Sequence, residues 1–87
     1  MFKMNDKADA EEAVALLRSM DGQIPSLRSL EAGVNVIDTD RSYDVGIMTT
    51  FDDAAGWKEY ADHPFHAPVI AWMKAHTATS VAVDYEI

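Results

Sequence analysis

Two histidines, a tyrosine and a carboxylate fall within seven positions of this 87-residue chain, in the run Tyr60-Ala61-Asp62-His63-Pro64-Phe65-His66. Their imidazole, phenol and carboxyl groups are those that move protons in many proteins. An imidazole has an ordinary pKa of about 6.5, so its neutral form can accept a proton near physiological pH. We therefore expect the chemistry of the protein first in this run, which we call the Tyr60–His66 segment.

The same segment has two other interpretations. His63 and His66 stand three positions apart with Asp62 adjacent, and together they could supply two or three ligands to a metal ion. Pro64 distorts that spacing and no further ligand is close in sequence, so we expect neither a metal nor another cofactor. Alternatively, the histidines and Pro64 only shape a break between two helices, and Tyr60 is an aromatic residue at the edge of the core.

A second group of residues could line a pocket for a small hydrophobic or aromatic molecule. Sulfur and indole side chains are typical of such pockets, although the same spacing also fits an ordinary core. Asp84 either lines the cavity or is solvated on an edge strand, and we favour the second. The candidate ligand-binding residues are His63, Met48, Trp57, Trp72 and Asp84.

The clearest predicted helix covers residues 9–20. Asp9 can act as its N-cap, with Glu12 three positions later in the capping-box position. Gly22 follows and can adopt the left-handed conformation that ends many helices. The apolar residues of this helix recur at the spacing of one buried stripe, formed by Ala13, Leu16, Leu17 and Met20.

Two further helices are predicted on either side of the Tyr60–His66 segment. Asp52 or Asp53 can cap the first of them. Pro64 ends it, because the residue before a proline avoids the α region. The next helix is expected over residues 67–76, with Pro68 in its first turn, where a proline is tolerated.

Strands are predicted where apolar residues alternate with polar or small ones. The alternating segments are residues 30–36, 44–51 and 79–87. The middle one carries little charge on either face, so it is expected to be central and covered on both sides. Met1–Met4 is read as the end of a first strand, which is either short or begins before this sequence does.

The resulting order is β-α-β-β-α-β, which is the ferredoxin-like α+β arrangement in a single domain of residues 1–87. It implies one antiparallel four-stranded sheet with its helices on one face. The other face then needs a partner, and two sheets facing each other in a homodimer would form a dimeric α+β barrel. A small domain without cysteines often gains stability in this way.

Charge excludes some classes of function. The formal net charge of −8 opposes binding to phosphate backbones, so nucleic acid is not an expected partner. No apolar run approaches the roughly 20 residues that span a bilayer. The N-terminus has no apolar signal core, and we expect a cytoplasmic protein that does not bind membranes.

The chain resembles the stress-responsive A/B barrel (Dabb) family along nearly its whole length. The matching features are Ile24-Pro25, Leu30–Asn35, Phe51-Asp52, the Tyr60–His66 segment and Val83-Asp84-Tyr85. The Tyr-x-x-His-Pro-x-His pattern is the most specific of them. The resemblance implies ferredoxin-like protomers that dimerise into a barrel, with a stress-related or unassigned role and a cavity for a small organic molecule.

The resemblance also implies an alternative function. A plant polyketide cyclase of this family uses a tyrosine and the second histidine of the equivalent run, and these positions correspond to Tyr60 and His66. By that analogy His66 would be the base and Tyr60 the acid of a cofactor-free cyclase or isomerase. Monooxygenase chemistry of related barrels is a third possibility, but no residue pattern here supports it.

Overall fold

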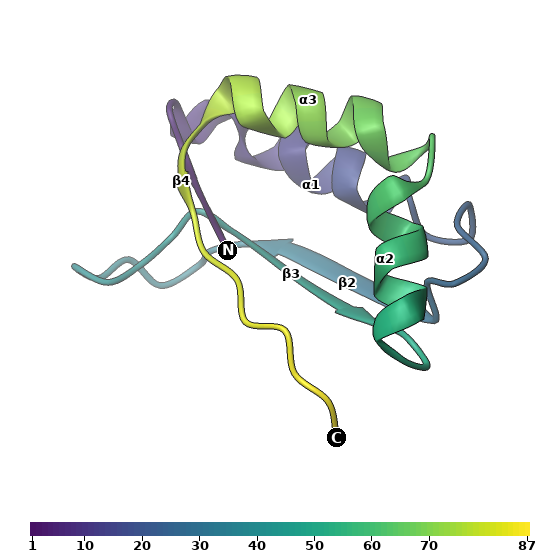
Figure 1. Ribbon diagram of the computed structural model, residues 1–87. Coiled ribbons are helices and arrows are strands. Elements are labelled where there is room, and N and C mark those ends of the chain that lie inside the picture. The colour runs from purple at the N-terminus through teal and green to yellow at the C-terminus, as the bar shows by residue number, and fades with distance from the viewer.

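The computed structural model describes residues 1–87, and its helices lie to one side of a sheet (Figure 1). The predicted βαββαβ order is confirmed, with the second helix divided in two. The elements are β1 (Phe2–Met4), the short 3-10 helix η1 (Lys7–Asp9), α1 (Ala10–Arg18), β2 (Ser29–Val34), β3 (Val45–Thr50), α2 (Ala54–Asp62), α3 (His66–His76) and β4 (Thr77–Ser80).

The four strands are antiparallel and lie in the order β2-β3-β1-β4. Strand β2 pairs with β3 over its full length. The three residues of β1 join the two halves of the sheet, since Phe2 lies opposite Val45 on one side and Ser80 on the other. Strand β3 is therefore central, as its sequence predicts, and β2 and β4 are the edges.

The hydrophobic core lies between the helices and the sheet. Residues of α1 and of the turn after it form much of this core, because the stripe predicted for α1 faces the strands. Leu17 and Met20 are almost fully buried, Ala13 is buried and Leu16 is half-buried. Burying a leucine side chain stabilises a fold by about 1.5–3 kcal/mol. The largest fully buried side chains are Leu17, Met20, Ile24, Met73 and Val45.

The start of α1 differs from the prediction. Asp9 already has helical backbone angles and its side chain makes no capping hydrogen bond. The chain turns one residue after the extended Asp6 into η1, and the Asp6 carboxylate accepts a hydrogen bond from Ala8 N at 2.9 Å. The predicted capping box of Asp9 and Glu12 is therefore wrong, because a 3-10 turn moves the cap to Asp6. Gly22 has the predicted positive φ, at 79°.

The break between α2 and α3 follows the predicted rules. Asp53 caps α2, and its carboxylate accepts a hydrogen bond from Gly56 N at 2.8 Å. Helix α2 ends at Asp62, and His63 before Pro64 is extended, with φ −67° and ψ 138°. Helix α3 begins one residue earlier than expected, at His66, and keeps Pro68 within its first turn.

The last predicted strand is shorter than its sequence pattern indicates. Regular pairing ends with Ser80, and residues 81–87 are exposed without secondary structure, so the predicted strand over residues 79–87 is wrong for most of its length. The physical reason is pairing: β4 has only β1 as a neighbour, and the last bonds join Val81 to Met1. Backbone beyond that point has no strand beside it.

One face of the sheet is covered and the other is open. The helices lie on one side of the strands, as predicted (Figure 1). Strand β2 ends at Val34, two residues before the predicted end, and Val36 is 91% exposed. On β3, Gly46, Met48 and Thr50 alternate with the positions that face the helices, and they point to the open side. Coverage of both faces, expected for this strand, is thus not provided within one chain.

Helix length and hydropathy in this fold do not meet the requirements of a membrane span. No helix is both long and apolar enough to cross a bilayer.

Candidate functional site

Tyr60 lies in the last turn of α2, with its ring in the core. The residue is 8% exposed, and its ring centroid lies 5.1 Å from that of Phe51 in a tilted arrangement. The hydroxyl makes no hydrogen bond within the chain and is not among the enclosed unpaired atoms, so it keeps contact with solvent. The phenol is therefore held by its ring while its hydroxyl stays free.

His66 is the first residue of α3 and faces Tyr60 across the helix break. Its ring centroid lies 4.5 Å from that of Tyr60, with the ring planes inclined by 58°. The backbone N–H of His66 donates to His63 O at 2.9 Å, which fixes the start of the helix. The turn at Pro64 thus brings two residues six positions apart into direct ring contact.

His63 has a structural role in this turn. Its Nδ1 accepts a hydrogen bond from Phe65 N at 3.0 Å, and its own N–H donates to Tyr60 O at 3.2 Å. Because its Nδ1 is hydrogen-bonded to the backbone, the imidazole holds the loop between the helices in place. Of the two histidines, His66 is the one available for chemistry.

Burial changes the acidity of both members of the pair. Burial raises the pKa of the Tyr60 phenol above its usual 10.0, so the group keeps its proton at neutral pH. Burial lowers the pKa of His66 below 6.5, and the nearby Ala61 backbone opposes this in part. A neutral imidazole beside a protonated phenol is a base next to an acid.

The structure does not bring the other candidate residues to this pair. Met48 is on the open sheet face, 61% exposed, and Trp57 is 44% exposed on α2. Trp72 stacks on His76 with ring centroids 3.9 Å apart, and His76 Nδ1 lies 2.8 Å from Trp72 O. Asp84 is exposed in the C-terminal segment. These residues therefore belong to four separate places, and Met48 is the one that β3 presents on the open face of the sheet.

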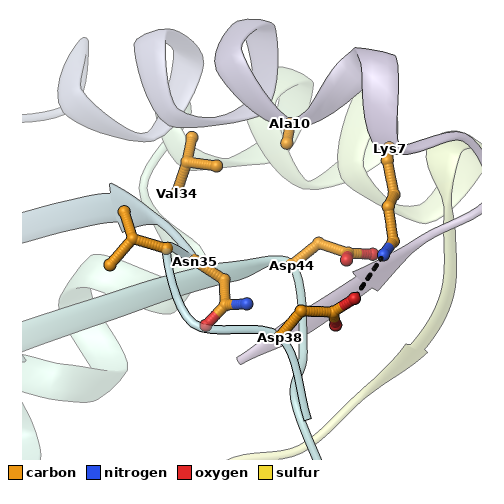
Figure 2. Close-up of a pocket in the computed structure, with 7 residues that line it drawn as sticks. Lys7, Ala10, Val34, Asn35, Asp38 and Asp44 are labelled. Carbon is orange, nitrogen blue, oxygen red and sulfur yellow. Dashed lines mark ion pairs between the residues drawn. The ribbon is translucent and has the colours of Figure 1, made fainter.

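A cavity of about 170 Å³ lies between the start of α1 and the end of β2 (Figure 2). Lys7 and Asp38 form an exposed ion pair of 3.7 Å at its mouth. Asp44 also lines it and is the only buried charged residue, with one carboxylate oxygen accepting a bond from Met4 N at 2.8 Å. The role of Asp44 is not evident from the sequence, because its hydrogen-bond partner lies 40 positions away. The only available signal was an acidic residue beside an apolar strand.

A second cavity, of about 350 Å³, lies beside the start of α2. Arg28 and Asp52 meet there at 2.6 Å, and this guanidinium holds the pKa of the Asp52 carboxyl below its ordinary value. Both side chains are largely exposed, so the pair contributes little to stability. Neither this cavity nor the first is lined by Tyr60 or His66.

Metal-binding groups are dispersed in this fold. No three His, Asp or Glu side chains lie where they could hold one ion together. The spacing of His63, His66 and Asp62 along the chain is therefore not matched by a ligand cluster in space.

Comparison with known proteins identifies the family. Residues 1–87 match the Stress responsive A/B Barrel Domain, Dabb. The chain belongs to the Dabb family. An uncharacterised protein from Streptomyces coelicolor is 38% identical over 92 residues. The alignment covers 99% of this chain and 93% of that protein. The Dabb assignment thus extends over the entire sequence.

Solved structures similar to this Dabb chain share its fold. A dimeric ferredoxin-like protein of unknown function from Thermobifida fusca has a TM-score of 0.86 and 26% identity, and covers 100% of this chain and 85% of its own. Another, from Jannaschia sp., has a TM-score of 0.80 and 27% identity, and the match covers 100% of this chain and 93% of that one. A third, from Bacteroides fragilis, has a TM-score of 0.83 and 22% identity, and the match covers 99% of this chain and 89% of that one. The ferredoxin-like fold of the chain is confirmed.

Proposed function

We propose that this Dabb protein works as a homodimer whose open sheet faces enclose a cavity for a small organic molecule. The observation that supports it best is the open face itself. Its central strand presents Gly46, Met48 and Thr50, with no charge among them. The dimeric relatives from Thermobifida fusca and Jannaschia sp., each similar over the whole chain, support the assembly. Two such faces packed against each other form a barrel, in which each sheet covers the open face of the other.

The chemistry of the face indicates the class of ligand. Met48 is flexible and polarisable, and its 61% exposure makes it the largest apolar contact that β3 offers. Lys3 and Glu31 alternate onto the same side from β1 and β2, and are the charged residues of the paired strands there. A small apolar or aromatic molecule with one polar group fits a cavity of this composition.

A ligand-detected NMR screen of aromatic and aliphatic metabolites tests this proposal. We expect hits with wild type that are lost in Met48→Glu, which places a carboxylate on the proposed cavity wall. Trp57→Glu is the matched control, because it places the same charge at an exposed apolar residue on the helical layer. Hits that survive Met48→Glu, or that Trp57→Glu abolishes equally, would contradict a cavity between the sheets.

A second candidate function rests on the contact between Tyr60 and His66. It is a cofactor-free aldol cyclisation, in which neutral His66 removes a proton from a carbon between two carbonyl groups. The Tyr60 hydroxyl donates a hydrogen bond to the resulting enolate oxygen. The enolate carbon then forms a bond to a second carbonyl carbon of the same molecule, and the alkoxide takes back the proton from the His66 imidazolium. The ring contact of 4.5 Å and the free hydroxyl favour this function.

The experiment for the enzyme uses a linear β-polyketone and follows the absorbance of the cyclised product. General-base catalysis contributes about 10²–10⁴ to rate, so His66→Ala should lose at least about 100-fold. His76→Ala is the control, because that ring is half-buried and stacked on Trp72, outside the pair. Equal rates for wild type and His66→Ala would exclude His66 as the base.

A further inference from the structure

Asp44 is the one charged side chain that this fold buries, and neither proposed function uses it. The residue is 9% exposed and directly precedes β3. Its backbone N–H donates to Phe2 O and its backbone C=O accepts from Asn35 N, both at 2.8 Å. Its Oδ2 accepts from Met4 N at the same distance. Three hydrogen bonds to β1 and to the residue after β2 therefore hold the carboxylate in one orientation.

The second oxygen of this buried carboxylate has no partner in the chain. Asp44 Oδ1 makes no hydrogen bond, yet it is not among the enclosed unpaired atoms, so it keeps contact with solvent. Asp44 lines the cavity of about 170 Å³ beside α1, and its carboxylate is drawn there in Figure 2. Burial of a carboxylate is costly unless it is hydrogen-bonded or paired with a charge. A partner for Oδ1 therefore has to come from the cavity.

The charges that line the cavity favour a cation as that partner. Asp38 and Asp44 contribute two carboxylates and Lys7 contributes one ammonium, which leaves a net charge of −1. Lys7 pairs with Asp38 at 3.7 Å, and the two side chains are 69% and 78% exposed. An ion pair so exposed contributes little and is readily displaced. Lys7 forms no ion pair with Asp44, so one further positive charge would neutralise the lining.

The rest of the lining is largely apolar and open. Val34 at the end of β2 is 41% exposed, Val36 is 91% exposed, and Ala10 of α1 is buried behind them. Figure 2 shows Val34 at one end of the cavity and the carboxylates of Asp38 and Asp44 at the other. A water molecule takes about 30 Å³ in the liquid, so the cavity of about 170 Å³ holds about six non-hydrogen atoms. A short alkyl chain with one charged end matches this arrangement.

A metal ion matches the cavity less well than an organic cation. Calcium and magnesium take about six or more oxygen ligands. No three His, Asp or Glu side chains lie where they could hold one ion. The Asn35 amide, which also lines the cavity, uses its Nδ2 to bond Ile37 O at 2.9 Å. An ammonium group has only three donors to satisfy, and two carboxylates can accept from it.

We propose that this cavity binds the ammonium group of a short primary alkylamine. The nitrogen donates to Asp44 Oδ1 and, in place of Lys7, to the Asp38 carboxylate, while the alkyl chain lies along Val34 and Val36. The net charge of −8 attracts cations to the protein as a whole. A free amine and a lysine side chain share this chemistry. Tyr60 and His66 do not line the cavity, so the proposal is independent of the catalytic pair.

The test is an NMR titration of the ¹⁵N-labelled full chain with n-butylammonium chloride at constant ionic strength. The Met4 amide is the reporter, because it donates to the same carboxylate. We expect saturable shifts with butylammonium and none with butyrate or butanol, which have the same chain length. Nα-acetyl-lysine methylamide presents the same ammonium on a peptide unit. Binding of this compound at least as tight as that of butylammonium assigns a lysine side chain, and weaker binding assigns a free amine.

Four variants test the roles of the charged groups. Asp44→Asn still accepts from Met4 N but loses the charge, so the Kd for butylammonium should rise at least about 10-fold. Asp38→Asn should also raise it, at an exposed position where the fold is not at risk. Lys7→Gln should lower the Kd, because it removes the competing ammonium. Asp40→Asn is the matched control: it removes an exposed charge of the same loop outside the cavity, and the Kd should stay within about threefold of wild type.

The contrary results are distinct from one another. Binding of butyrate, or a higher Kd for butylammonium in Lys7→Gln, would show that the cavity takes an anion through Lys7. An unchanged Kd in both Asp44→Asn and Asp38→Asn would place the amine elsewhere on the chain. Absence of any saturable shift with butylammonium would refute the site. Each of these results overturns the proposal and leaves both proposed functions untouched.

Discussion

Replacing Tyr60 by phenylalanine removes only the hydroxyl, and the structure predicts almost no loss of stability. A hydrogen bond made by such a group would contribute about 0.5–1.5 kcal/mol. The Tyr60 hydroxyl makes none within the chain and keeps contact with solvent. We therefore expect Tyr60→Phe to change the free energy of unfolding by less than about 0.5 kcal/mol, as do most substitutions away from specific interactions.

Tyr60→Ala provides the comparison, because it removes the buried ring as well. The ring packs on Phe51 at 5.1 Å and on His66 at 4.5 Å, so its loss leaves a cavity in the core. Such truncations cost about 3–5 kcal/mol, a large share of the 5–15 kcal/mol that typically stabilises a domain. Comparing the stability losses of Tyr60→Phe and Tyr60→Ala separates the contribution of the hydroxyl from that of the packed ring.

Urea unfolding followed by far-UV CD gives both values. All proteins must be compared at one concentration, because the proposed dimerisation would make stability depend on protein concentration. A loss of more than about 1.5 kcal/mol in Tyr60→Phe would show that the hydroxyl has a structural partner, and the argument that it is left free for chemistry would fail. A small loss in Tyr60→Ala would show that the ring is not part of the core.

Three further predictions can be measured with the same methods. Leu17→Ala should cost about 2–5 kcal/mol in urea unfolding, since Leu17 is 1% exposed, and the half-buried Leu16→Ala should cost less. Because burial depresses the folded-state pKa of His66, the unfolded chain binds more protons, and stability should decline below about pH 6.5 in wild type but less in His66→Gln. Gly46→Val fills open space in one chain, so sedimentation should show a weaker dimer while the CD spectrum is unchanged.

Local rules were sufficient for the helix break that carries the candidate site. Pro64 forces His63 out of the α region, and Pro68 is confined to the first turn of the next helix, so both boundaries were predictable to within one residue. The cap of α1 was not, because Asp6 and Asp9 are chemically equivalent candidates. The choice between them depends on whether the chain turns first through η1, which local propensity does not determine.

At the candidate site, too, the sequence predicted some features and only the folded chain determined others. Residue types and the resemblance to a family singled out Tyr60 and His66, but their ring contact and the solvent access of the hydroxyl exist only in the folded chain. The buried carboxylate of Asp44 is bound by the backbone of Met4, on a strand 40 positions away. No local pattern reports a partner at that distance, since it depends on which strands become neighbours.

By itself the sequence determined the order of the elements, the apolar stripe of α1 and the division of the second helix, because periodicity and proline act over a few residues. It also marked residues 79–87 as a half-buried strand. Tertiary structure decided that pairing stops at Ser80, since burial and pairing need a neighbouring surface and β1 provides one only as far as Val81. The alternating apolar residues of 81–87 therefore indicate a half-buried strand, but one copy of the chain has no surface that buries them.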